Sequence, residues 1–112
     1  MGASEIAPAK RRVALRIKFS ARALREIGEA HEWYESQSPG LGSEFLAATE
    51  LQLERLQQAP LLYAEVIDGV RRALLPRFPY AVFFAIRNDL VHILALIHLA
   101  RSPQRWPKRR GP

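Results

Sequence analysis

Two apolar segments on either side of a short polar break constrain the fold more than any other feature of this chain. Residues 78–87 and 90–99 contain few polar side chains and are rich in Val, Ile, Leu and Phe, residue types that favour strands. The break between them is Asn88-Asp89, and both residue types tolerate the positive φ angles of a two-residue hairpin turn. The sequence therefore predicts a β-hairpin at the centre of a sheet, with both faces of the hairpin covered.

A strand and a helix are predicted before this hairpin. Residues 13–19 alternate between apolar and polar side chains, with Val13, Leu15, Ile17 and Phe19 on one side, which is typical of a half-buried strand. Ser20 follows as a candidate N-cap, and an amphipathic helix is expected from there to about Gln37. Trp33 and Tyr34 are interpreted as packing aromatics rather than ligand contacts. The predicted inward stripe is Leu24, Ile27, His31 and Tyr34, flanked by Ala23, Ala30 and Trp33.

A second helix is predicted after a turn. The segment 38–42, Ser-Pro-Gly-Leu-Gly, breaks the first helix because proline cannot continue its hydrogen bonds and glycine allows unusual backbone angles. Ser43 can cap the second helix, and Pro60 marks its end. Two helices joined by so short a break form an antiparallel hairpin. The predicted inward stripe of the second helix is Phe45, Leu46, Thr49, Leu53 and Leu56.

One small α+β domain is the fold class that these elements favour. After a turn at 66–69, residues 70–75 are predicted as a strand, so the order is β-α-α-β-β-β, with the helical hairpin packed on a small antiparallel-rich sheet. A chain of 112 residues supports one modest core. We expect the domain to span 13–106, between a flexible basic extension (1–12) and a basic tail (107–112). The extension leads to the hypothesis that translation starts at Val13 through an alternative start codon.

The formal charge of +6 is concentrated at the two ends of the sequence. Residues 101–112 contain five basic residues and no acid, and residues 1–12 contain three basic residues against Glu5. Residues 13–100 carry a formal charge of −1, in which the predicted helices are acidic and the predicted strands are basic. A basic sheet face is suited to an anionic partner, although solvated strand arginines are the alternative interpretation.

The composition argues against a metal or disulfide protein. Cysteine is absent and the three histidines are scattered, so we expect no metal and no cofactor. The first twelve residues hold no continuous apolar run that could form a signal peptide, and no stretch approaches the roughly 18 apolar residues of a membrane span. The expectation is a cytoplasmic protein that has no membrane partner.

Several local motifs occur together in an order that resembles the RelE/ParE toxin superfamily. That superfamily has the same β-α-α-β-β-β order. This chain is more similar to the ParE branch, because it lacks the lysine-rich patch on the later strands and the C-terminal tyrosine that we associate with RelE nucleases. The motifs are Glu32-Trp33-Tyr34-Glu35, Pro39-Gly40-Leu41-Gly42, Phe45-Leu46, Gly69-Val70-Arg71-Arg72, Arg77-Phe78-Pro79-Tyr80, and His98-Leu99-Ala100-Arg101-Ser102-Pro103 with Trp106.

The resemblance implies a toxin of a type II toxin–antitoxin (plasmid stabilisation) system. A ParE-like toxin arrests growth by binding and inhibiting DNA gyrase, without bond chemistry of its own, and a cognate antitoxin neutralises it in a hetero-oligomer. The alternatives are a RelE-like, ribosome-dependent mRNA endonuclease and a non-toxic partner-binding module. The candidate residues for binding the target or the antitoxin are Arg71, Arg72, Arg77, Tyr80, His98, Arg101 and Trp106.

The endonuclease alternative needs a cation at the phosphate and an acid or base nearby, and its candidate catalytic residues are Arg72, His98 and Arg101. The hairpin register predicts whether these side chains share a face. A two-residue turn at Asn88-Asp89 places His98 opposite Pro79. A similar turn at Pro76-Arg77 then places Arg72 on the same face as His98, whereas a bulge would reverse this assignment.

Overall fold

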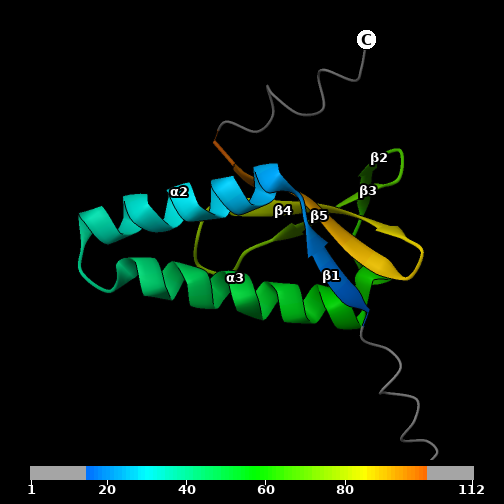
Figure 1. Ribbon diagram of the computed structural model, residues 1–112, viewed down its shortest axis with the longest axis horizontal. Coiled ribbons are helices and arrows are strands. Elements are labelled where there is room, and N and C mark those ends of the chain that lie inside the picture. Colours follow the sequence, from blue (N-terminus) through cyan, green and yellow to red (C-terminus); the bar gives the residue numbers. More distant parts are fainter. Residues whose placement is uncertain (1–14, 101–112) are drawn as a thin grey trace, which may run out of the picture.

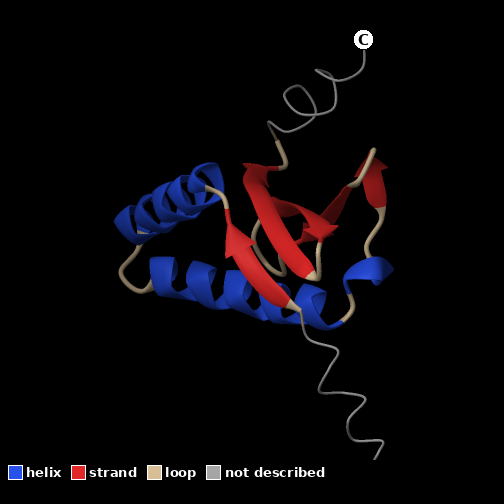
Figure 2. Ribbon diagram, turned by 45° about the vertical axis from the view of Figure 1, so that its right-hand side comes forward, coloured by secondary structure: helices blue, strands red, loops and turns tan. Residues whose placement is uncertain are grey.

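Five strands and two long helices form two layers in the computed structural model, which describes residues 15–100 (Figure 1). Both helices lie on the same side of the sheet (Figure 2), so the expected α+β class is confirmed. The elements are β1 (Arg16–Phe19), α2 (Ala21–Gln37), α3 (Leu41–Gln58), the 3₁₀ helix η1 (Pro60–Leu62), β2 (Glu65–Ile67), β3 (Val70–Leu74), β4 (Tyr80–Arg87) and β5 (Leu90–His98).

The sheet has the strand order β1-β5-β4-β3-β2, which makes β4 and β5 central as predicted. Asn88 and Asp89 form the turn between them with φ angles of 51° and 63°. Two features differ from the expected sheet. β1 pairs with β5 in parallel, because the helical hairpin returns the chain across the sheet. The segment expected to be only a turn contains β2, a three-residue edge strand that pairs with β3.

Ser20 is confirmed as the N-cap of α2. Its hydroxyl accepts a hydrogen bond from the backbone N–H of Ala23, which satisfies one of the unpaired donors of the first turn. Two assignments on this helix are wrong. Leu24, predicted in the inward stripe, and Trp33, predicted at its flank, are each 56% exposed. The residues of α2 that are fully buried are small, Ala23 and Ala30, and they let the helix lie close to the sheet.

The first turn of α3 is capped from the preceding helix and not by Ser43, which lies inside α3. Gly40 is the N-cap residue and has a φ of 91°, in the left-handed region that glycine adopts without steric cost. The carboxylate of Glu35 accepts hydrogen bonds from the N–H groups of Gly40 (3.0 Å) and Gly42 (2.9 Å). Glu35 therefore performs the capping role that the sequence pattern assigned to Ser43.

These bonds make Glu35 a source of pH-dependent stability. Hydrogen bonds from Gly40 and then Gly42 lower the pKa of the Glu35 carboxyl. A lowered folded-state pKa contributes stability that is present above the unfolded-state pKa and is lost as the pH falls through the folded-state pKa. We expect Glu35→Gln to lower the melting temperature at neutral pH and to reduce the additional loss on acidification. Thermal denaturation across acidic and neutral pH measures this, with Glu32→Gln, an exposed acid on the same helix, as the control. Parallel pH curves for wild type and Glu35→Gln would contradict the assignment.

The main core lies between the helices and the sheet. Its largest fully buried side chains are Phe45, Phe84, Leu56, Ile93, Val82 and Val91. A smaller cluster lies on the opposite face of the sheet, where Ala81, Phe83, Ala95 and Ile97 are buried and Val70 and Leu99 pack against them. Side chains on both faces of the central hairpin are thus buried, but among the described elements the two long helices cover one face only. Within residues 15–100, no helix has the length and apolar character to cross a bilayer.

Candidate functional site

A β-bulge in the central hairpin decides which side chains share a face. Between the turn and the Phe84–Ile93 pair, the strands follow the predicted register. Leu94 is then an extra residue, and beyond it the register shifts by one, so His98 pairs with Tyr80 and not with Pro79. Because side chains alternate along a strand, this shift moves the end of β5 to the opposite face from the one predicted.

The bulge is held in place by the start of α2. The Ser20 hydroxyl donates to the carbonyl of Leu94 at 3.0 Å, and the N–H of Leu96 donates to Oε1 of Glu26 at 2.8 Å. β1 pairs with β5 only as far as Ile93. The Leu94 carbonyl and the Leu96 N–H lie beyond that point, on the edge of β5 that β1 leaves uncovered. The helix thus satisfies the backbone groups that the bulge would otherwise leave unpaired.

As a result, Arg72 and His98 do not share a face. Arg72 pairs with Phe83 in the β3–β4 ladder and lies on the face turned away from the helices, which we call the outer face. His98 lies on the helix side, with its ring 5.0 Å from that of Tyr80. Arg71 lies on the helix side with Tyr80. It donates to the carbonyl of Tyr63 (2.7 Å) and lies 3.7 Å from a carboxylate oxygen of Glu65.

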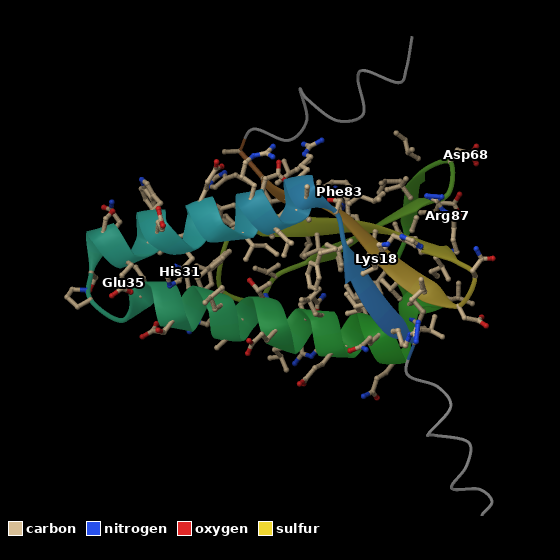
Figure 3. All side chains as sticks on the ribbon, in the orientation of Figure 1. Lys18, His31, Glu35, Asp68, Phe83 and Arg87 are labelled. Carbon is tan, nitrogen blue, oxygen red and sulfur yellow. The ribbon has the colours of Figure 1, made fainter. Side chains whose placement is uncertain are left out.

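Four exposed cations surround the apolar cluster on the outer face. Alternation along the paired strands places Arg16 and Lys18 of β1, Arg72 of β3 and Arg87 of β4 on this face. Figure 3 shows Lys18 on β1 and Arg87 on β4. Among the described strand residues, none on this face is acidic. An apolar centre with a cationic rim is suited to a partner of negative potential.

A groove of about 790 Å³ lies between α2 and the end of β5. Trp33, which we interpreted as a packing aromatic, contributes to this groove. The spacing contained the signal, because Glu26, Ala30 and Trp33 fall on one helix face, whereas adjacent residues such as Trp33 and Tyr34 cannot both face the core. The groove is lined by Arg22, Glu26, Glu29, Ala30, Trp33 and Tyr34 from α2, and by Pro79, Tyr80, Leu96, Ile97 and His98 from the sheet.

The titratable rings of this groove are engaged within the fold. The Nδ1 atom of His98 accepts a hydrogen bond from the N–H of Ala100 at 3.0 Å. Burial raises the pKa of the Tyr34 hydroxyl, and Tyr80 raises it further. Tyr80 is 8% exposed and stacks edge-on against Phe45. These contacts place Tyr80 in the core as well as in the groove wall.

The remaining candidate residues lie elsewhere. Arg77 has a φ of 68° and sits in the loop between β3 and β4. Its Nη2 atom forms an exposed ion pair with Glu44 of α3 at 2.9 Å, and its guanidinium lies 5.2 Å from the ring centre of Phe78. Arg101 and Trp106 fall outside the described residues. Within residues 15–100, no three His, Asp or Glu side chains gather as a metal site would require.

Comparisons with known proteins agree with this architecture. The fold is similar to that of a chain from a chromosomal ParDE toxin–antitoxin system of P. aeruginosa, with a TM-score of 0.69 and 20% identity over 77% of this chain and 97% of that one. It is also similar to a chain of the RelBE2 toxin–antitoxin complex of Mycobacterium tuberculosis, with a TM-score of 0.54 and 20% identity over 77% and 99% of the two chains.

Sequence comparison identifies the family. No curated protein matches the chain, but residues 17–103 match the family model described as the ParE toxin of the type II toxin–antitoxin system parDE. That match covers all the strands and helices described above except Arg16, the first residue of β1. This chain therefore belongs to the ParE toxin family of type II toxin–antitoxin systems.

Proposed function

We propose that this chain arrests growth by binding and inhibiting DNA gyrase, and that a cognate antitoxin neutralises it in a hetero-oligomer. The family match supports a ParE-type toxin, and the two similar folds come from toxin–antitoxin systems. The observation that carries the choice of binding over cleavage is the placement of Arg72 and His98 on opposite faces of the sheet.

That separation bears directly on RNA cleavage. Attack by a 2′-hydroxyl needs an acid or base within hydrogen-bond reach of the reacting atoms and a cation at the same phosphate. Two side chains that leave opposite faces of one sheet cannot both contact one phosphate group. In this proposal the outer-face cations hold a partner of negative potential, and the bonds of that partner stay intact.

A first experiment tests the toxin itself. Induced expression of the chain is expected to arrest growth, and co-expression of the adjacent small open reading frame is expected to relieve the arrest. Unimpaired growth with verified soluble protein would count heavily against a toxin.

Arg72→Ala is expected to weaken inhibition of gyrase supercoiling by roughly tenfold, because one hydrogen bond to a charged group contributes about 1.5 kcal/mol or more. Arg87→Ala is expected to act in the same direction. Arg25→Ala is the matched control, since Arg25 is an exposed arginine of α2 outside the outer face. Equal inhibition by Arg72→Ala, Arg87→Ala and the control would remove the outer face from the proposed mechanism.

One observation favours the endonuclease as a second candidate. His92 lies on the outer face, paired with Lys18 of β1 and Ala85 of β4, and it offers a titratable ring among the cations. If the chain is a nuclease, induction is expected to cause rapid mRNA cleavage while supercoiling is unaffected, and His92→Ala is expected to abolish the cleavage. That pair of results would replace gyrase with mRNA as the target.

A further inference from the structure

The cations of the outer face differ from other arginines of the fold in having no acidic partner. Elsewhere, four ion pairs join a glutamate to an arginine, at Arg22, Arg25, Arg71 and Arg77. Within residues 15–100, no ion pair involves the outer-face cations, which are Arg16, Lys18, Arg72 and Arg87. All four are exposed. Their charges are therefore available to a partner.

These cations form two rows on either side of β5. One row is Arg16 and Lys18 on β1, and the other is Arg87 on β4 with Arg72 on β3. Lys18 and Arg87, one from each row, are labelled in Figure 3. Since β5 separates β1 from β4, the rows lie about 10 Å apart at Arg87 and about 14 Å apart at Arg72. The major groove of B-DNA is about 12 Å wide, so the two rows are spaced like the two phosphate backbones that border it.

The helical layer on the other side of the sheet has the opposite charge. Together, α2 and α3 carry seven glutamates and three arginines, a formal charge of −4. A polyanion is repelled by that layer and attracted by the outer face, so the domain would approach it in one orientation.

A duplex fits this face better than a single strand does. Single-stranded nucleic acids are held largely by unpaired bases that stack on aromatic rings, and the described strands place no tyrosine or tryptophan on the outer face. A duplex backbone requires only cations in the right places. Two rows of unpaired cations at the spacing of a groove meet that requirement.

We propose that the outer face binds the phosphate backbones of duplex DNA, with Arg16 and Lys18 on one strand and Arg72 and Arg87 on the other. The contacts are to phosphates, so the binding is independent of base sequence. The cellular role of this contact rests on the proposed function, in which the DNA held by gyrase becomes the negative partner of this face.

Fluorescence anisotropy of a short labelled duplex, titrated with the full chain at several NaCl concentrations and without gyrase, tests the proposal. Lys18→Ala and Arg87→Ala are each expected to lower the affinity several-fold. Each is also expected to make the slope of log affinity against log salt less steep by about 0.9, the contribution of one phosphate contact. Arg55→Ala, which removes an exposed arginine of α3, is the matched control and should keep the wild-type slope. The eight basic residues in 1–12 and 101–112 are present in every variant.

A substitution with the opposite expected sign locates the contact further. Asp89 lies in the hairpin turn beside Leu90, which pairs with both Arg16 and Arg87, so its carboxylate would repel a phosphate bound there. Asp89→Asn is expected to raise the affinity for the duplex. Asparagine tolerates the φ of 63° at this position, and the turn should be kept. Unchanged or weaker binding by this variant would contradict the placement of the DNA.

Other outcomes would overturn the proposal. Equal affinities and slopes for Lys18→Ala, Arg87→Ala and the Arg55→Ala control would remove the outer face from DNA binding. Tighter binding of single-stranded DNA or RNA than of the duplex would exclude a duplex site. Binding of poly-glutamate in place of the duplex, weakened by the same two variants, would replace DNA with an acidic protein. Failure to bind DNA while gyrase is still inhibited would contradict this inference alone, whereas duplex binding without inhibition of gyrase would contradict the proposed function.

Discussion

Replacing Phe45 with alanine is expected to lower the free energy of unfolding by about 3–5 kcal/mol. The side chain is completely buried and joins the two layers. Its ring stacks on that of Tyr34 at 5.4 Å and meets those of Phe78 and Tyr80 edge-on, each at 5.5 Å. Its removal would therefore leave a cavity between α3, α2 and the sheet. Small domains are stable by about 5–15 kcal/mol, so much of the total stability would be lost.

Urea denaturation followed by circular dichroism measures this effect. Leu51→Ala is the control, because Leu51 is on the same helix but 41% exposed, and its effect is expected to stay within about 1 kcal/mol. Since Tyr80 rests against Phe45, the variant should also disturb the groove beside α2. Comparable losses for the two variants would show that Phe45 does not hold the layers together.

Gly42→Ala is expected to destabilise the chain by about 1–3 kcal/mol, the usual range for overpacking. A Cβ atom at this position would lie 2.8 Å from Cδ2 and from the carbonyl oxygen of His31, and 2.9 Å from Oε1 of Glu35. The carbonyl belongs to the backbone of α2 and cannot turn aside, so the two helices would have to separate at the hairpin. The same shift would disrupt the Glu35 bonds that cap α3.

Gly28→Ala is a matched control in the same helical hairpin. A Cβ atom at Gly28 meets nothing within 4 Å, and alanine is favoured over glycine in a helix by about 1 kcal/mol. This variant is therefore expected to raise the melting temperature, whereas Gly42→Ala lowers it. The same sign for both substitutions would rule out close contact as the reason for glycine at position 42.

The main elements follow from local properties of the sequence, which is why they could be predicted. The central hairpin rests on two apolar segments and on the tolerance of Asn88-Asp89 for positive φ. The start of α2 rests on Ser20, whose hydroxyl reaches an N–H only three residues away. The family motifs are local as well, and their order led to the assignment that the family model confirms.

Side-chain direction on α2 was less predictable. Leu24 was assigned to the inward stripe and Trp33 to its flank because both are large and apolar, but the width of the buried face of a helix depends on what packs against it. The sheet lies close to α2 because Ala23 and Ala30 are small, and only a narrow face of the helix is then buried. Trp33 therefore lies outside the core and lines the groove. This position depends on how closely α2 approaches the sheet.

By itself, the sequence determined the α+β class, the family and the set of candidate cations, since each depends on residue types and on short spacings. Only the tertiary structure decided which candidates lie together. Hydrogen bonds from the start of α2 and its N-cap to β5, made by residues 74 and 70 positions apart in the sequence, stabilise the bulge at Leu94. Because side chains alternate along a strand, that one extra residue puts His98 beside Tyr80 on the helix side and leaves Arg72 with Phe83 on the outer face.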